Sequence, residues 1–488
     1  MQIDSGAAAR HLSDMTNLTP ADDAFAASLN LPPAAFPALT ASYLEEPRGR
    51  YASEGGLLIA PANTDEVAKI MTAAHAAHVP VVPYSGGTGL VGGQIAQDLP
   101  RPVILSLHRM NKIRAVYPDE NVLVAEAGAI LADVQTAAEK VDRLFPLSLA
   151  SEGSARIGGV LSTNAGGVNV LRYGNARDLC LGIEAVLPNG EVMNTLSRLR
   201  KNNTGYDLRH LLIGAEGSLG IITAAALRLS PRPASTGVAL FAVESPRAAL
   251  ELLSLAGDIA GGTVSAFELM HRQGFEFLRE TMPETRQPWP TPPEWTVLVD
   301  LSGPANFDPE VTLTQLFEAG CLRDLVYDGL IAQSAREADE FWAIRETIPE
   351  ANRRIGSVSS QDIAVPLSRI PDFIAQGTEA IAALGQFRIN CFGHVGDGNL
   401  HFNIFPVAGK SRADYDDIRP TVKRTLHDLA HSFGGSISAE HGIGRLKVDD
   451  LERYGDPVKL AAMRAIKDAL DPHGICNPGA VLRRAPSE

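Results

Sequence analysis

Three glycine-rich segments, far apart along the chain, constrain the fold more than any other feature. The first runs from Ser85 to Gly93, the second runs from Ser151 to Gly159, and the third runs from Gly214 to Ile222. Loops with so little side-chain bulk let backbone N–H groups converge on an anionic group such as a pyrophosphate. Three such loops in one chain indicate one long ligand that threads among them.

The first loop also matches a dinucleotide fingerprint, because Gly87 to Gly92 satisfies G-x-G-x-x-G. We reject that interpretation, since Gly93 to Pro100 does not begin a helix and the fingerprint is weak evidence outside a strand–turn–helix context. For the first loop taken alone, an ordinary flexible turn stays open. The second and third loops favour a ligand site.

The secondary-structure pattern predicts an α+β fold. Thr64 is a plausible N-cap for a helix with Val67, Ile70, Met71 and Ala74 at helical spacing. Strands are expected at 56–61, 79–83, 103–107, 122–126, 182–187, 221–229, 238–243, 296–301 and 362–365, with a hairpin turn at 188–190. Further helices are expected at 247–259, 335–354, 370–384 and 415–431.

Changes in composition divide the chain. Glycine density falls after Pro231 and Pro233, where a new alternation of strands and helices begins. We expect a lead segment at 1–45, a two-part ligand-binding domain at 46–230, an α+β cap domain with an antiparallel sheet at 231–435, and a C-terminal segment at 436–488 that returns to the first domain.

Composition and charge exclude several classes of protein. The 488-residue chain has a formal net charge of -14, and its Lys and Arg residues are dispersed, so a nucleic-acid partner is not expected. No apolar stretch of membrane-spanning length occurs. Four separated cysteines and a signal-free N-terminus over 1–23 favour a reducing, cytoplasmic location.

A candidate hairpin carries two histidines. Asp397-Gly398 favours a two-residue type I′ turn, which would place His394 opposite His401 and Phe392 opposite Asn403. His394, His401 and Asn403 would then share one face, and two imidazoles can bind one metal ion. A structural pair of hydrogen-bonded histidines is the alternative for these two residues alone.

A second cluster strengthens the metal interpretation. Glu440 and His441 are adjacent in the glycine-flexible segment 438–444, where neither helix nor strand patterning explains them. A carboxylate can complete a site with two imidazoles and leave a position open for substrate. A solvated loop is the alternative.

With these motifs, the sequence resembles the FAD-binding family of vanillyl-alcohol oxidase and p-cresol methylhydroxylase, and within it the D-2-hydroxyglutarate, D-lactate and glycolate dehydrogenases. The resemblance extends from about Arg48 onward. It implies the two-subdomain FAD-binding fold of that family. It also implies FAD contacts from Pro83, Ser85, Gly86, Gly87, Thr88, Gly89, Ser151, Glu152, Gly153, Ile157, Gly158, Thr163, Asn164, Gly217, Gly220, Ile222 and Asn477.

The resemblance also implies how the flavin is held. Family members with covalent FAD use a His in the first loop or a Cys in the second. Thr88 occupies the first position here, and the second loop contains no Cys. We therefore expect FAD to be bound without a covalent link.

Further roles follow from the same resemblance. It implies that His394, His401 and Glu440 bind a divalent metal, Zn²⁺ or Mn²⁺, that His441 is the base, and that Arg345 binds a substrate carboxylate, with Asn403 also in the catalytic site. Spacing alone would make Arg345 a surface residue. One departure appears at Ser360, where hydroxyglutarate-type relatives carry Lys, so a second substrate carboxylate loses a partner.

The implied activity is oxidation of a D-2-hydroxy acid, such as D-2-hydroxyglutarate, D-lactate or D-malate, by hydride transfer to flavin. An electron-transfer flavoprotein or a quinone would accept the electrons, and the oligomeric state stays open, a homodimer included. Two alternatives remain: an oxygen-using sugar or alditol oxidase of the same fold, which needs no metal cluster, and a non-catalytic flavin-binding subunit of a larger complex.

Overall fold

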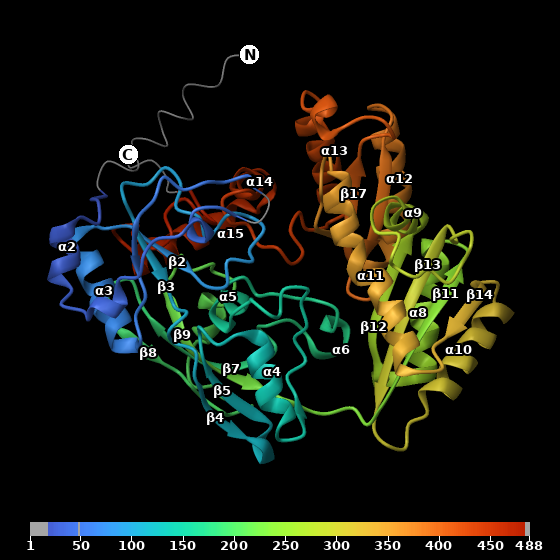
Figure 1. The fold of residues 1–488 in the computed structure, drawn as a ribbon, viewed down its shortest axis with the longest axis horizontal. Coiled ribbons are helices and arrows are strands. Elements are labelled where there is room, and N and C mark those ends of the chain that lie inside the picture. Colours follow the sequence, from blue (N-terminus) through green and yellow to red (C-terminus); the bar gives the residue numbers. More distant parts are fainter. Residues whose placement is uncertain (1–17, 47–48, 484–488) are drawn as a thin grey trace. The chain divides into compact units, whose positions relative to one another are not determined.

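The computed structural model describes residues 18–46 and 49–483 (Figure 1). Residues 1–17 of the expected lead segment lie outside the described residues. The chain forms two compact units. Of the described residues, unit 1 comprises 18–46, 49–165, 175–232 and 440–483, and unit 2 comprises 166–174 and 233–439. The short segment 166–174 thus groups with the second unit although its neighbours in sequence belong to the first.

Unit 1 contains two main sheets. A parallel sheet has the order β1-β3-β2, and an antiparallel sheet has the order β4-β5-β9-β7-β8. The strands are β1 (Leu57–Ile59), β2 (Val81–Tyr84), β3 (Val103–Ser106), β4 (Ile113–Tyr117), β5 (Val122–Glu126), β7 (Cys180–Val186), β8 (Val192–Asn194) and β9 (Ile221–Arg228), and the short strands β6 (Arg143–Leu144) and β10 (Ser230–Pro231) form a separate pair.

The helices of unit 1 are short, apart from two of fourteen residues, α3 and α15. They are α2 (Asp23–Ser28), α3 (Thr64–Ala77), α4 (Leu131–Glu139), α5 (Ile157–Ser162), α7 (Arg209–Leu212), α14 (Val448–Tyr454) and α15 (Pro457–Leu470). The predicted cap of α3 is wrong by one residue. Asn63 is the N-cap, because its side chain accepts a hydrogen bond from the Glu66 N–H at 2.9 Å.

Unit 2 is built on an antiparallel sheet with the order β14-β11-β13-β12-β16-β17-β15. Its strands are β11 (Ser235–Val243), β12 (Val264–His271), β13 (Trp295–Gly303), β14 (Val326–Ile331), β15 (Ile363–Ala364), β16 (Arg388–Gly393) and β17 (Asn399–Phe405). Its helices are α6 (Val170–Tyr173), α8 (Pro246–Ala260), α9 (Arg272–Thr281), α10 (Pro309–Leu322), α11 (Ala335–Ile355), α12 (Ile370–Ala382) and α13 (Arg419–Ser432).

Alternating side chains of this sheet supply two separate cores. Phe241, Phe267 and Phe402 belong to the core under α8, α10, α12 and α13, whereas Leu240 and Met270 belong to the core under α9 and α11. Because the strand period is two, both faces of each central strand must be apolar. The mixture of helices and antiparallel sheets confirms the predicted α+β class.

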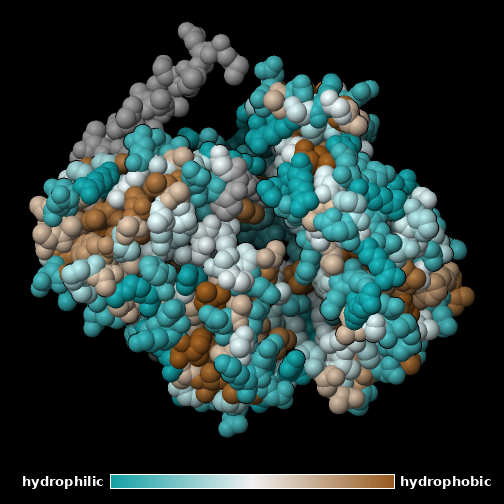
Figure 2. Space-filling view, in the orientation of Figure 1, coloured by the Kyte–Doolittle hydropathy of each residue, from teal (hydrophilic) through white to brown (hydrophobic). Residues whose placement is uncertain are grey.

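On the face shown in Figure 2, hydrophilic side chains predominate and hydrophobic ones form small patches. Within the described residues, no helix combines the length and the apolar character that a membrane crossing requires. The four cysteines are all free thiols.

Candidate functional site

The first two glycine-rich loops lie against each other in unit 1. A Cβ atom on Gly86 would approach the carbonyl oxygen of Ser154 to 2.4 Å, and the Gly159 N–H donates to Ser85 Oγ at 3.0 Å. Gly87 adopts a positive φ of 72°, which favours glycine. No larger residue fits at Gly86, so the two loops form one backbone-lined wall.

The third loop joins this wall next to β2. Gly217 has a φ of 72°, and a Cβ there would lie 2.4 Å from Cγ of Pro83. Asn477 ties the parts together, because its side-chain amide donates to the carbonyl oxygens of Gly93 at 2.9 Å and Glu216 at 2.8 Å. The buried Asn477 therefore acts as a structural link between the C-terminal segment and two of the loops.

The remaining predicted cofactor residues lie around these loops. Glu152 accepts a hydrogen bond from Gln135, and Asn164 Oδ1 accepts one from the Arg177 N–H at 3.0 Å. Thr88 and Gly89 continue the first loop, Ser151 and Gly153 belong to the second, Ile157 and Gly158 begin α5, Thr163 caps its end, and Gly220 and Ile222 lie at the start of β9. Such a glycine cradle, which added Cβ atoms would fill, fits an extended cofactor with a pyrophosphate.

The histidine hairpin forms, but its predicted register is wrong. His401 pairs with Phe392 and Asn403 pairs with Asn390, and a longer loop over 394–398 replaces the two-residue turn. The loop is longer because Val395 is fully buried, Asp397 Oδ1 accepts from the Asn399 N–H at 3.1 Å, and Gly398 has a φ of 90°.

The register error of two residues preserves the side-chain face. Since the strand period is two, His394 and His401 still point to the same side, with ring centroids 5.8 Å apart. Two imidazoles therefore meet, as expected from the alternation, although His394 lies in the loop and not in β16.

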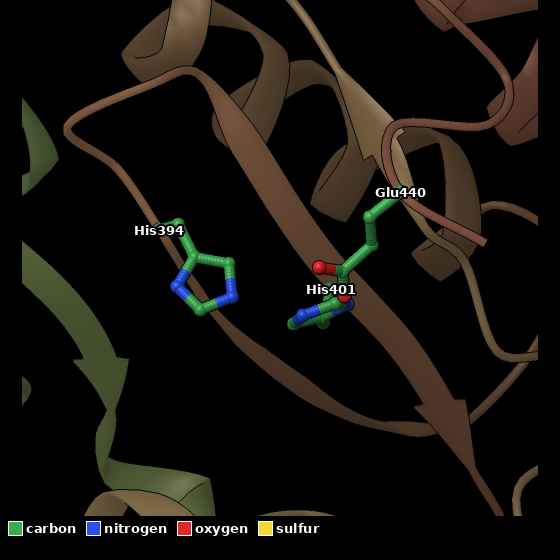
Figure 3. Close-up of side chains that lie close together, drawn as sticks. All are labelled: His394, His401 and Glu440. Carbon is green, nitrogen blue, oxygen red and sulfur yellow. The ribbon is translucent and has the colours of Figure 1, made fainter. Parts of the chain in front are cut away.

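His394, His401 and Glu440 form a cluster that can hold a metal ion. One ligand atom from each lies within 4.8 Å of the others. Figure 3 shows the three side chains pointing toward one another. Glu440 directly follows Ala439, whose N–H donates to the Asp362 carbonyl oxygen at 3.3 Å. Two imidazoles and a carboxylate are a ligand set found in catalytic zinc sites, so the residues present fit a divalent metal.

His441 lies beside this cluster. Its Nε2 is 3.6 Å from a carboxylate oxygen of Glu440, and both side chains are half-buried. The carboxyl group of Asp362 belongs to a second group of possible ligands with Glu440 and His441. Sequence analysis did not select Asp362. Its signal is an acidic residue directly before the apolar strand β15.

Arg345 is buried in unit 2 and not on the surface as its spacing alone would suggest. It extends from α11, and its Nε donates to Glu268 Oε2 at 2.8 Å. Its guanidinium carbon lies 4.8 Å from the centre of the Phe392 ring. In the described part of the chain, neither Nη atom of Arg345 forms a hydrogen bond with the protein. The planar fork can therefore bind a carboxylate.

Glu268 connects Arg345 to the metal cluster, and sequence analysis missed it. Its other carboxylate oxygen lies 2.7 Å from His394 Nδ1. Burial raises the pKa of Glu268, but a protonated His394, the charge of Arg345 and the hydrogen bonds from both side chains outweigh burial and lower the pKa to about 2. The signal in the sequence is a Glu at an inward position of an apolar strand, in phase with Ala266 and Met270.

Asn403 and Ser360, the two remaining positions singled out in the sequence, also have hydrogen-bond partners. Asn403 Oδ1 accepts a hydrogen bond from the Gln361 N–H at 2.9 Å, so this amide supports the segment that leads through Asp362 into β15. Ser360 Oγ lies 2.7 Å from Ser357 Oγ. A short hydroxyl therefore occupies the place where a Lys was expected in hydroxyglutarate-type relatives.

Two parts of the chain match known protein families. Residues 56–196 match the family described as FAD binding domain, and residues 232–481 match FAD linked oxidases, C-terminal domain. The chain belongs to the FAD-linked oxidase family. It is thus an FAD-linked oxidoreductase, as the resemblance implied.

Several curated relatives of this oxidoreductase span most of its length. It is 36% identical to the mitochondrial D-2-hydroxyglutarate dehydrogenase of Arabidopsis thaliana, with 89% of this chain and 76% of the relative covered. It is 36% identical to D-2-hydroxyglutarate dehydrogenase of Xanthomonas citri pv. viticola, with 86% and 88% covered. The D-2-hydroxyglutarate–pyruvate transhydrogenase of Saccharomyces cerevisiae is 33% identical, with 90% and 88% covered.

Solved structures confirm the fold. p-Cresol methylhydroxylase superposes with a TM-score of 0.69 at 16% identity and covers 98% of this chain and 97% of its own. Alkyldihydroxyacetonephosphate synthase gives the same TM-score at 16% identity, with 95% and 86% covered. The predicted vanillyl-alcohol oxidase type of fold is therefore correct.

Proposed function

We propose that this enzyme is an FAD-dependent, metal-assisted dehydrogenase that oxidises a D-2-hydroxy acid to the 2-oxo acid. The observation that carries the proposal is the cluster of His394, His401 and Glu440 with His441 beside it. The names of the relatives support the substrate class. Candidate substrates are D-2-hydroxyglutarate, D-lactate and D-malate.

FAD, when bound in the glycine cradle, supplies the acceptor for the hydride that leaves C2 of the substrate. Held by His394, His401 and Glu440, a divalent metal would make the C2 hydroxyl more acidic. A ring nitrogen of His441 takes the hydroxyl proton as the general base. Arg345 orients the substrate by binding its C1 carboxylate through the two Nη groups, which the ion pair with Glu268 leaves available.

Substrate length is set by what faces the far end of the acid. Ser360 offers only a hydroxyl, already 2.7 Å from Ser357 Oγ, where a Lys would offer a positive charge. A second carboxylate therefore gains less here than in relatives that carry the Lys. We propose that the enzyme accepts D-2-hydroxy acids of several lengths, with hydroxyglutarate not strongly preferred.

The electrons must leave the reduced flavin for a second acceptor. We propose an electron-transfer flavoprotein or a quinone, because hydride transfer to FAD completes only half of a catalytic cycle. Oxidation of the reduced enzyme by each purified acceptor, followed at the flavin absorption band, distinguishes the two.

An anaerobic screen of the flavin spectrum tests the proposed function. D-2-hydroxy acids should bleach the oxidised flavin, whereas the L-enantiomers and uncharged alcohols should not. Chelation should slow bleaching, and Zn²⁺ or Mn²⁺ should restore it. Bleaching by a sugar alcohol in metal-free enzyme would instead identify an oxidase of the same fold, and no bleaching by any acid would favour a non-catalytic subunit.

A further inference from the structure

Glu268 occupies a position where a charged side chain is costly. It lies at the centre of β12, and its side chain is 1% exposed. The neighbours on the same face, Met270 and Leu298, belong to the core under α11. Burying an ionised carboxylate in such surroundings is unfavourable unless partners compensate for the lost water. Both partners of Glu268 are functional candidates.

The first partner is His394. Nδ1 of this ring lies 2.7 Å from Glu268 Oε1. In Figure 3, one ring nitrogen of His394 points toward His401 and Glu440, and the other points away from them. A neutral imidazole that donates its Nδ1–H to a carboxylate has its lone pair on Nε2, which is the form that binds a metal.

The second partner is Arg345. Its Nε donates to Glu268 Oε2 at 2.8 Å, so the two oxygens of one carboxylate serve two different side chains. Both contacts lie within unit 2, where β12 carries Glu268, the loop after β16 carries His394 and α11 carries Arg345. One rigid group therefore fixes the orientations of an imidazole and of a guanidinium.

We propose that Glu268 is a positioning residue that holds His394 in its metal-binding orientation and Arg345 in its carboxylate-binding orientation. The role of Glu268 toward His394 is inferred from the geometry alone. Its role toward Arg345 rests on the proposed function, in which Arg345 binds the substrate carboxylate. Glu268 itself is not one of the proposed metal ligands. Its replacement should weaken two separate binding events.

Metal affinity tests the first half without any turnover. Zn²⁺ binding to the FAD-loaded, metal-stripped enzyme is measured by competition with a chromogenic chelator. Glu268→Gln should bind Zn²⁺ about 10- to 100-fold more weakly, the usual effect of losing a carboxylate behind a metal-binding histidine. Glu268→Asp, which keeps the charge, should recover part of the affinity. Unchanged affinity in Glu268→Gln would overturn the proposal.

Asp300→Asn is the matched control. Asp300 lies in β13, on the same face of the sheet as Glu268, and accepts a hydrogen bond from Trp342 of α11 at 3.0 Å. It contacts none of the proposed metal ligands in the described structure. This variant should bind Zn²⁺ like wild type. If the wild-type enzyme itself binds no divalent metal, the proposed metal assistance is wrong. Equal Zn²⁺ affinity of wild type and Glu268→Gln is a different result, which contradicts only the role of Glu268.

A second measurement reads the His394 ring in the wild-type enzyme and needs a variant only to assign its signal. Long-range ¹H–¹⁵N spectra of the histidine rings report which nitrogen carries the proton. In metal-free enzyme at pH 8, His394 should be the Nδ1–H tautomer, assigned by the signal that disappears in His394→Asn. An Nε2–H tautomer for His394 would contradict the proposal.

The second half is tested at saturating Zn²⁺, where the defect in metal affinity no longer matters. Glu268→Gln should still show KM for the hydroxy acid raised by about tenfold, because a charged guanidinium without its fixed partner binds less well. The kcat should fall less than the KM rises. A wild-type KM under these conditions would remove Arg345 from the proposal.

Discussion

Gly86 lies so close to Ser154 that a Cβ atom would stand 2.4 Å from its carbonyl oxygen. This contact brings the first two glycine-rich loops together without a side chain between them. We expect Gly86→Ala to force the loops apart at a cost of about 1–3 kcal/mol, a common penalty for overpacking. Bound FAD per chain, measured by absorbance after desalting, should drop clearly below that of wild type.

Gly257→Ala is the control for this experiment. Gly257 lies in α8, and no heavy atom comes within 4 Å of its Cβ position. Alanine is the better helix former, so FAD content should be unchanged and the thermal midpoint equal or slightly higher. Full FAD content in Gly86→Ala would show that the loop contact does not matter for the cofactor.

FAD is expected to leave the protein when the enzyme is denatured. Thr88 stands where a histidine would form the covalent link in some family members, and the second loop has no cysteine. Acid precipitation should therefore give a yellow supernatant and a colourless pellet, as measured at the flavin absorption band. Colour that stays with the pellet would show a link to another residue.

Activity is expected to require one divalent metal per chain. Chelation should remove most of the turnover and leave the flavin spectrum unchanged, because the glycine loops and the cluster of His394, His401 and Glu440 are separate sets of residues. Elemental analysis gives the metal content, and titration with Zn²⁺ or Mn²⁺ should restore activity at one ion per chain. Full activity in a metal-free preparation would contradict this expectation.

The sequence predicted the position of the hairpin better than its register. His394 and His401 share a face because alternation has period two, and a shift of two residues keeps it. The loop itself was not predictable, because it depends on burial of Val395 and on Leu171, a residue distant in sequence that approaches Gly396. Local turn preference for Asp397-Gly398 was outweighed by these tertiary contacts.

Glu268 shows that the candidate site, like the loop, could not be predicted completely from the sequence. Its strand was not predicted, and its function as a partner becomes visible only when β12 is placed beside β16 and under α11. Residues with strong local signals, such as the glycines and the histidines, could be selected from the sequence. A residue that acts through two partners far away in the chain could not.

Asp300 should make stability depend on pH. Burial raises its pKa to about 6, although Trp342, Ser302 and Arg172 act in the opposite direction. The folded state therefore holds the proton more tightly than the unfolded state, so stability falls as pH rises from about 4 through 6. Asp300→Asn avoids this loss and should exceed wild type by about 1–3 kcal/mol above pH 7, with little difference near pH 4.

Urea denaturation of the metal-free proteins at pH 4.5 and pH 7.5 measures this difference. Metal is removed because bound metal would add its own pH dependence. The gap between Asp300→Asn and wild type should be larger at pH 7.5. An equal gap at both pH values would show that Asp300 keeps an ordinary pKa in the folded protein.

His441 and Glu440 are neighbours in sequence with different expected functions. Their side chains lie next to each other, with His441 Nε2 3.6 Å from a Glu440 oxygen, so Glu440 can bind a metal while His441 faces a substrate beside it. His441→Ala should keep FAD and metal content near those of wild type, yet slow anaerobic flavin reduction by about 10² to 10⁴, the usual contribution of a positioned base. Glu440→Gln should lose metal affinity first and activity with it.

In wild type, kcat/KM should rise with pH as the imidazole becomes neutral, and this rise should be absent in His441→Ala. Flavin reduction at the wild-type rate in His441→Ala, or metal loss as its only defect, would assign the proton transfer to another group.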